Sequence, residues 1–178
     1  WQGWQIPVLT TDDHSNSRIK NINIQNLSGK FSTGMQVAVI AGFQGVSNHL
    51  RITTLGRGGS DTTAVALAAA FQAKRCDIYT DVDGVFTTDP KITPNAQKLG
   101  KISYEEMLEL ASLGAKVLQT RSVELAMNYK VTLRVLNSFV EGSGTLVCDE
   151  ESIMEKRIVS GITFSKDEAK LTLVGIKD

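Results

Sequence analysis

The 178-residue sequence predicts an α/β fold: an open, mainly parallel sheet sandwiched by helices. Residues 37–41 form a continuous apolar run, which is typical of a buried parallel strand. A glycine-rich turn at residues 56–59 leads into an alanine-rich segment with helical character. Residues 76–80 are then predicted to form a further strand. The apolar strand that starts at Ile52, the helix and this further strand together predict a right-handed βαβ unit.

The N-terminal third contains two weaker signals on either side of a polar segment. Residues 6–9 are predicted to form a short strand, and residues 12–18 a polar loop. The apolar run at 37–41 ends in a glycine-punctuated turn at Gly42–Gly45.

The central segment, residues 56–90, is expected to form the edge of the sheet at which ligands bind. Ser60 or Asp61 can cap a helix that continues over residues 62–73. The turn before that helix would then lie at the carboxyl end of a parallel strand, which is the usual ligand edge of an open α/β sheet. Residues 81–90 form a loop rich in carboxylates and hydroxyls.

The C-terminal third predicts two helices and a strand. A capping box at Ser103–Glu106 opens a helix that we expect to end at Gly114. Residues 115–129 are predicted to form another helix, and residues 131–135 a strand. Two strand candidates follow from about residue 157, and we assign them to the start of a second domain.

The composition limits which classes of protein this chain can belong to. With 42% apolar residues, the chain can form one domain with a full core. The 19 basic and 19 acidic residues cancel, so we expect no nucleic-acid partner. No apolar run is long enough to predict a membrane span. Cys76 and Cys148 are interpreted as reduced core thiols of a cytoplasmic protein. The chain begins at Trp1 without a signal peptide, and both of its ends are expected to be cut from a longer protein.

Several catalytic patterns are missing from the sequence. It contains neither a G-x-x-x-x-G-K-[ST] phosphate loop nor a G-x-G-x-x-G fingerprint. The two histidines, His14 and His49, do not lie in a recognisable catalytic pattern. We therefore expect neither a Ser-His-Asp or Cys-His mechanism nor a histidine-based metal site.

The remaining candidates are charged residues around the glycine turn and the loop after it. The turn offers exposed backbone N–H groups and a helix N-terminus, which together suit a small anionic substrate or a phosphate. Phosphoryl transfer needs mainly positioning and charge neutralisation, and an ionised carboxylate acceptor needs no general base. The candidate charges are Arg57, Asp61, Asp81, Asp83, Asp89, Lys91 and Lys116.

Each of these features also has a purely structural interpretation. Residues 56–59 could form an ordinary tight turn. Residues 81–84 start like a calcium loop, but the glycine comes too early and no glutamate closes the loop, so a plain turn is the alternative. Lys116 could be a solvated lysine, and Tyr79 and Phe86 could be core residues.

Six segments taken together resemble the aspartate kinases, which are members of the amino acid kinase family. They occur in the family order and cover most of residues 1–150: Gly42–Gly45, Thr53–Ala64, Tyr79–Val85, Thr87–Pro90, Ile102–Met107 and Leu113–Leu118. The tail from about Ile158 is similar to the start of the regulatory ACT region of these enzymes. The resemblance thus implies the nucleotide-binding half of a kinase domain at 1–150, and a linker with the start of an ACT domain at 151–178.

The resemblance implies the transfer of the γ-phosphoryl group of ATP to the side-chain carboxylate of L-aspartate, with Mg²⁺ as a cofactor. The product, 4-phospho-L-aspartate, opens the pathway to lysine, threonine and methionine. Lysine or threonine would act as the feedback inhibitor, and the full-length protein would be a homo-oligomer.

The resemblance also implies roles for individual residues. Asp61 would organise the active-site lysines, and Lys116 would meet the ATP phosphates, which makes these two residues the catalytic pair. The aspartate substrate would contact Arg57, Gly58, Gly59 and Ser60. The nucleotide would contact Thr80, Asp81, Phe86, Asp89, Pro90, Lys91 and Lys116. No protein side chain is assigned to the metal.

The sequence departs from the family pattern at three places and in its length. Phe86 and Lys91 stand where the family usually has tyrosine and arginine, and Gln119-Thr120 replaces a common His-Pro pair. The family's N-terminal Lys-Phe-Gly-Gly segment, whose lysine contacts the transferred phosphate, is missing. We therefore expect little or no kinase activity from this chain alone.

Two alternatives remain open. One is another amino acid kinase, such as a glutamate 5-kinase or an acetylglutamate kinase, although residues 57–61 and the ACT-like tail argue against it. The other is a non-catalytic nucleotide- or effector-binding module.

Overall fold

The computed structural model describes residues 1–115, 117–153 and 159–164. Within these ranges the chain forms two small sheets, four α-helices and one 3-10 helix. The elements in chain order are β1 (Val8–Thr10), β2 (Ile19–Ile22), α1 (Gln25–Ser32), β3 (Gln44–Ser47), β4 (Ile52–Thr54), α2 (Gly59–Ala70), β5 (Cys76–Thr80), β6 (Lys101–Ser103), α3 (Tyr104–Ser112), α4 (Thr120–Tyr129), β7 (Leu133–Asn137), β8 (Thr145–Cys148) and η1 (Glu150–Ser152).

The first sheet has the strand order β2-β1-β3-β4. Strand β1 pairs parallel with β3 and antiparallel with β2, and β3 pairs antiparallel with β4. The hydroxyls of Thr10 and Thr53 are buried and hydrogen-bond each other at 2.6 Å. This bond satisfies two polar groups inside the sheet that would otherwise be costly to bury.

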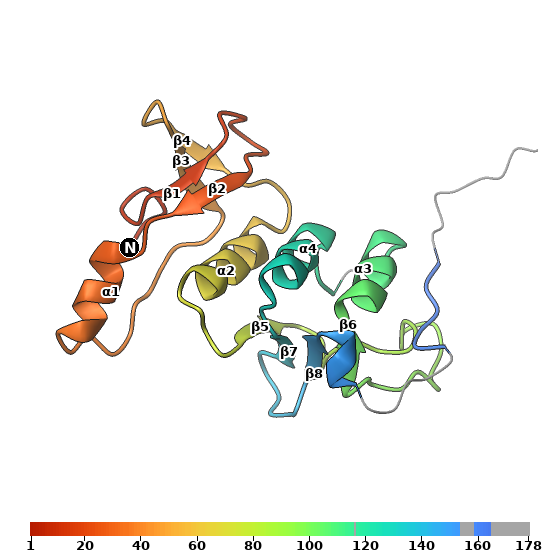
Figure 1. The fold of residues 1–178 in the computed structure, drawn as a ribbon. Helices are drawn as coiled ribbons and strands as arrows, with labels where there is room; N and C mark the ends of the chain where they lie inside the picture. Colours follow the sequence, from red (N-terminus) through yellow and green to blue (C-terminus); the bar gives the residue numbers. More distant parts are fainter. Residues whose placement is uncertain (116, 154–158, 165–178) are drawn as a thin grey trace, which may run out of the picture.

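The second sheet has the strand order β5-β7-β8-β6 and carries the main core. Strands β5 and β7 are parallel, so their carboxyl ends meet, with Thr80 opposite Asn137. Helices α2, α4 and α3 lie next to one another on one side of this sheet (Figure 1). The core between them includes the fully buried Val65, Met107 and Val123.

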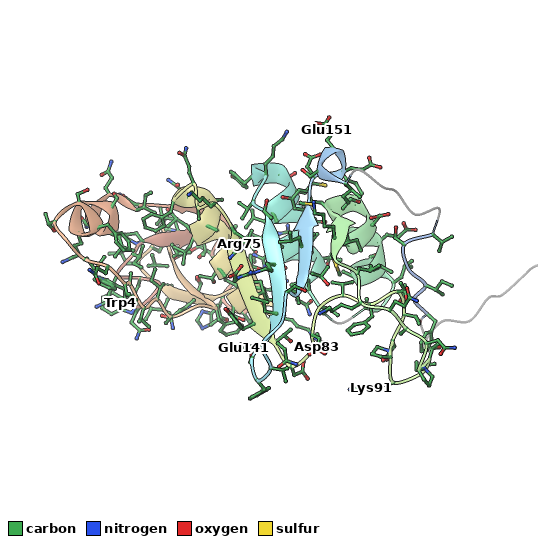
Figure 2. The ribbon with its side chains drawn as sticks, turned by 90° about the horizontal axis from the view of Figure 1, so that it is seen from below. Trp4, Arg75, Asp83, Lys91, Glu141 and Glu151 are labelled. Carbon is green, nitrogen blue, oxygen red and sulfur yellow. The ribbon has the colours of Figure 1, made fainter. Side chains whose placement is uncertain are left out.

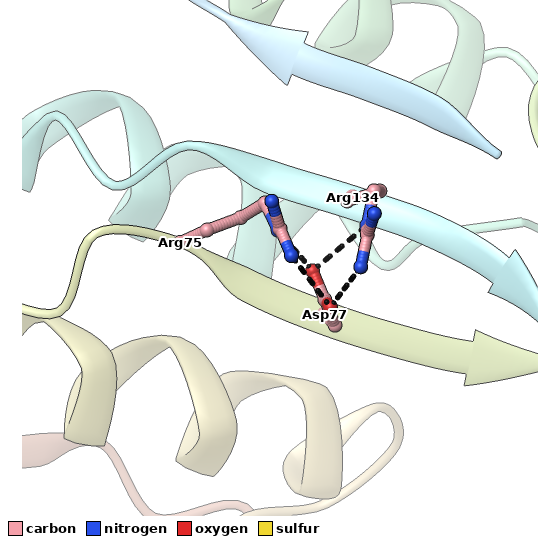
Figure 3. Close-up of polar contacts among 3 residues, drawn as sticks. All are labelled: Arg75, Asp77 and Arg134. Atoms are coloured by element: carbon pink, nitrogen blue, oxygen red, sulfur yellow. Dashed lines mark hydrogen bonds and ion pairs between the residues drawn. The ribbon is translucent and has the colours of Figure 1, made fainter. Parts of the chain in front are cut away.

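Three charged residues join β5 and β7 through their side chains (Figure 3). Asp77 accepts hydrogen bonds from Arg75 and Arg134, each with a shortest distance of 2.5 Å. Burial raises the pKa of the Asp77 carboxyl, but the bonds from Arg75 and Arg134 outweigh it, and the pKa falls below its usual value. The cluster is partly exposed, so screening by water limits its contribution to stability.

Several predictions from the sequence are confirmed. The α/β class holds, and strand β5 has the predicted bounds. Ser103 caps α3: its side chain accepts from the N–H of Glu106, whose carboxylate accepts from the N–H of Ser103. The helix ends before Gly114, whose φ of +117° lies in the left-handed region that favours glycine. Cys76 and Cys148 are free and buried.

The predicted βαβ unit is wrong. Strand β4 belongs to the first sheet, where its neighbour β3 is antiparallel, and β5 belongs to the second sheet. Helix α2 therefore connects two sheets instead of crossing over within one. The sequence could not reveal this, because a strand of three residues has no feature that selects its neighbour.

The predicted strand at residues 37–41 is also wrong. This segment is extended, but it belongs to neither sheet, and the side chains of Val37 and Val39 are 74% and 77% exposed. Its described backbone hydrogen bonds are those of Val39 and Ala41 with Trp1. An apolar run favours a buried strand only when other elements cover it, and here the described elements leave Val37 and Val39 exposed and cover Ala38, Ile40 and Ala41 only in part.

Other boundaries also differ from the prediction: β1 and β7 begin two residues later than predicted, at Val8 and Leu133. Helix α4 begins at Thr120 rather than at residue 115. Helix α2 spans Gly59–Ala70 and begins earlier than predicted, with Gly58 at its N-cap and no capping side chain from Ser60 or Asp61.

The C-terminal predictions fall mostly outside the described residues. Residues 159–164 are described and form no strand; the N–H of Ile162 donates to the carbonyl of Thr87 at 2.7 Å. The remaining part of the predicted ACT start lies at positions that the structure does not describe. None of the described helices is long and apolar enough to cross a membrane.

Candidate active site

The glycine turn between β4 and α2 depends on two residues with positive φ. Gly56 has a φ of +77° and Gly58 a φ of +68°, a region that side chains other than glycine rarely adopt. The N–H of Gly59 donates to the carbonyl of Gly56 at 3.0 Å, and this bond closes the turn. The chain thus passes from strand to helix within four residues, and the N–H groups of the first turn of α2 are left at the helix end.

The turn packs tightly against residues that are distant in sequence. A side chain at Gly58 would collide with Gln119, because its Cβ would lie 2.0 Å from the Cγ of Gln119. The Gly42–Gly45 motif also contacts the first turns of α2. The N–H of Phe43 donates to the hydroxyl of Thr63 in that helix at 3.1 Å. Two of the motifs noticed in the sequence therefore meet at the start of α2.

Arg121, in the first turn of α4, binds the backbone on both sides of this site. Its guanidinium donates to the carbonyl of Leu55 at 2.7 Å and to the carbonyl of Ser17 at 2.6 Å. The N–H of Ser17 in turn donates to the carbonyl of Thr54 at 3.0 Å. Burial, and then the charge of Arg18, lower the pKa of Arg121. Arg121 thereby holds α4, the 11–18 loop and the glycine turn together.

This arrangement brings the N-termini of two helices together. Gly58 is the N-cap of α2 and Gln119 is the N-cap of α4, and the two residues are in contact. Each helix N-terminus carries a partial positive charge. Their convergence favours a negatively charged ligand at the turn.

The predicted substrate and catalytic residues lie around this point, with one exception. Arg57 and Ser60 are exposed, and Gly59 is buried against Leu55 and Phe43. Asp61 is half-buried in the first turn of α2, and burial raises the pKa of its carboxyl. Among the described residues, none forms an ion pair with Asp61. Lys116 is at a position that the structure does not describe.

The predicted nucleotide residues lie on the loop after β5. The hydroxyl of Thr80 donates to the carboxylate of Asp81 at 3.1 Å. The carboxylate of Asp89 accepts a hydrogen bond from the N–H of Lys91 at 2.9 Å, and this bond stabilises the turn that contains both residues. Phe86 is half-buried and pairs with Lys98 through a single backbone bridge.

The nucleotide loop lies at the end of the sheet where β5 and β7 finish. Figure 2 shows Asp83 and Glu141, from the loops after these two strands, at that same end. Pro90 and Lys91 are exposed. No described hydrogen bond or ion pair joins this loop to the glycine turn.

Sequence reasoning missed several residues that shape the site. Arg121 binds the turn, Asn137 binds the nucleotide loop, and Thr145 anchors the far end of that loop. One signal was available for Arg121: a cation in the first turn of a helix is unfavourable to the helix dipole, which suggests that another contact holds it there. Asn137 and Thr145 form contacts that depend on the pairing of strands, which the sequence did not reveal.

The fold and the site define an α/β protein in which two helix N-termini meet at a glycine-rich turn. The chain belongs to the amino acid kinase family, whose match covers residues 2–137. It is 59% identical over 179 residues to the aspartate kinase of Pseudomonas putida, a match that covers 100% of this chain and 43% of that protein. The chain therefore spans less than half the length of this relative.

Solved structures agree with this assignment. Escherichia coli aspartokinase III in complex with aspartate and ADP, in its R-state, is 34% identical with a TM-score of 0.76, over 84% of this chain and 34% of that chain. The same enzyme in complex with lysine and aspartate, in its T-state, has a TM-score of 0.68 at the same identity and coverage.

Proposed function

We propose that the protein containing this chain is an aspartate kinase, which phosphorylates the side-chain carboxylate of L-aspartate at the expense of ATP. The observation that carries this proposal is the convergence of two helix N-termini on the turn at Gly56–Asp61. The identity of 59% to an aspartate kinase extends over the entire chain and so includes this turn. Its product, 4-phospho-L-aspartate, would enter lysine, threonine and methionine biosynthesis.

The turn suits the amino acid substrate. Arg57 presents an exposed guanidinium, whose fork matches the geometry of a carboxylate. Ser60 and the N–H of Gly58 would supply further hydrogen bonds at the positive ends of the helices, and Gly59, whose own N–H closes the turn, would let the substrate approach the backbone. The acceptor carboxylate is ionised at neutral pH, so the reaction needs charge screening and no general base.

The loop after β5 suits the nucleotide. We assign it to Thr80, Asp81, Phe86, Asp89, Pro90 and Lys91, with Lys116 at the phosphates. In the transfer, a carboxylate oxygen bonds to the γ-phosphorus, the bond to the β–γ bridging oxygen breaks, and ADP leaves with that electron pair. Mg²⁺ would bind mainly to the phosphates, because no three histidine, cysteine, aspartate or glutamate side chains of the described residues gather into a cation site.

We also propose that catalysis needs residues beyond this chain. Asp61 is half-buried and has no ion-pair partner among the described residues. A carboxylate in that position suits a lysine, and because Lys116 is assigned to the ATP phosphates, we assign the partner of Asp61 to a lysine from outside the chain. The isolated 178-residue chain should therefore bind ligands better than it catalyses.

The division of the chain and its regulation are part of the proposal. Residues 1–150 would belong to the kinase domain, and residues 151–178 to a linker and the start of an ACT domain. Lysine or threonine would inhibit the full-length, cytoplasmic homo-oligomer. The lysine complex of the E. coli enzyme supports lysine as the first choice.

A coupled assay of ADP release tests the proposed reaction in the full-length protein. L-Aspartate, L-glutamate, N-acetyl-L-glutamate and UMP are offered with ATP and Mg²⁺, and hydroxylamine traps the acyl phosphate. We expect turnover with L-aspartate and the matching hydroxamate. Arg57→Ala should raise the KM for aspartate, while Arg51→Ala, an exposed arginine outside the site, should not. A higher kcat/KM for any other acceptor would contradict the proposal.

A further inference from the structure

Asn137 occupies the last position of β7, directly opposite Thr80, the last residue of β5. The pairing continues one step further, because the N–H of Ser138 donates to the carbonyl of Thr80 at 2.8 Å. Asn137 is thus fixed at the edge of the sheet where the proposed nucleotide loop begins.

The side chain of Asn137 joins the two loops that leave this edge. Its Oδ1 accepts from the N–H groups of Phe139, at 2.7 Å, and Val140, at 3.3 Å. Its Nδ2 donates to Oδ1 of Asp83 at 2.6 Å. The orientation of the amide is determined by its partners, because only the oxygen can accept from two backbone N–H groups and only the nitrogen can donate to a carboxylate.

The far end of the nucleotide loop is held separately. The N–H of Val85 donates to the hydroxyl of Thr145 at 2.9 Å, and Gly84, at a φ of +145°, packs directly against that hydroxyl. The segment from Asp81 to Asp83 therefore lies between the backbone bond of Ser138 to Thr80 at its start and the bond of Asn137 to Asp83 at its end, with Thr145 holding the chain two residues further on. Loss of the Asn137 anchor would free the part of the loop that follows Thr80.

We propose that Asn137 is a positioning residue for the nucleotide: through Asp83 it fixes the backbone of residues 80–84 that the nucleotide contacts. The inference rests on the proposed function, since it assigns that loop to ATP. Asn137 itself acts through Asp83 and does not touch the nucleotide. Its loss should weaken ATP binding while the glycine turn keeps its affinity for aspartate.

The test exchanges the two polar groups. In Asn137→Asp, the new carboxylate still accepts from Phe139 and Val140, but it faces the carboxylate of Asp83 and repels it. The double variant Asp83→Asn with Asn137→Asp restores a donor–acceptor pair of opposite polarity at the same place. Asn48→Asp, in the exposed turn between β3 and β4, is the charge-matched control.

Calorimetry with ATP–Mg²⁺ and steady-state kinetics are measured on the full-length protein. We expect Asn137→Asp to raise both the Kd and the KM for ATP by about tenfold, which corresponds to one lost polar interaction. The KM for aspartate should stay within about twofold, and the double variant should return the Kd to within about threefold of the original. If Asn137→Asp does not fold, Asn137→Ala, which removes the same bonds without adding charge, is expected to weaken ATP binding likewise.

Three results would overturn the inference. The first is an Asn137→Asp variant that binds ATP as well as Asn48→Asp does. The second is a double variant that fails to recover ATP binding. The third is a parallel rise of both KM values, which indicates a general structural role. Absence of ATP binding by the unmodified protein would instead remove the proposed function, and the inference with it.

Discussion

Replacement of Arg121 by alanine should loosen the site more than any other single change at its periphery. The guanidinium donates to two backbone carbonyls, those of Leu55 and Ser17, at 2.7 and 2.6 Å. A hydrogen bond with one charged partner contributes roughly 1.5–3 kcal/mol. Because Arg121 is only half-buried, the lower value applies to each bond. The variant should therefore lose about 3 kcal/mol of unfolding free energy, a large share of the roughly 5–15 kcal/mol that a domain has.

Urea unfolding followed by circular dichroism measures this loss. Arg121→Lys should recover only about half of it, because an ammonium group lacks the fork that reaches two carbonyls. Arg51→Ala removes an exposed arginine and should stay within about 0.5 kcal/mol of the original. If Arg121→Ala costs no more than Arg51→Ala, the guanidinium does not hold the turn, and our account of the site geometry is incorrect.

Three further changes test other parts of the structure. Gly58→Ala should destabilise the fold by about 1–2 kcal/mol and raise the KM for aspartate, because φ is +68° and the methyl group would displace Gln119; unchanged urea midpoints would contradict this. Thr145→Val leaves the carbonyl of Leu99 without its 2.6 Å donor, so denaturation should show a loss of about 1–3 kcal/mol, whereas a neutral result would imply a substitute donor. Burial raises the pKa of Cys76 to about 11, so the folded state holds this proton more tightly than the unfolded chain does. The corresponding stability is complete below about pH 9 and is lost as the pH rises towards 11; urea midpoints of Cys76→Ala should lack that part of the alkaline decline.

Local signals in the sequence predicted the local structure well. The capping box at Ser103 and the stop at Gly114 depend on residues within one turn of each other, and both are confirmed. Strand β5 was also predicted with its observed bounds. Strand partners are set by contacts between distant segments, and this explains the error over β4, whose three residues join a different sheet from β5.

The candidate site was likewise predictable in its local features and not in its long-range contacts. The glycine turn was recognisable because positive φ values at Gly56 and Gly58 restrict those positions to glycine. The contact of Gly58 with Gln119 was not predictable, since it needs α4 to begin at Thr120 and to pack beside α2 with the two N-caps together. Residue types thus indicated which chemistry is present, while tertiary packing determines where the groups meet.

Asp61 connects the stability of the fold with its function. Burial raises the pKa of its carboxyl, so the protonated form is favoured by folding and the ionised form is not. The stability that comes from this group is therefore greatest at low pH and is lost as the pH rises through the folded-state pKa. At neutral pH the chain retains a half-buried anion without an ion-pair partner among the described residues, in the first turn of α2. The N-terminus of α2 favours a carboxylate in this turn, and a cationic ligand or lysine that arrives there would also offset the cost of burial. The same desolvation that weakens the isolated fold would strengthen the attraction between Asp61 and that cation.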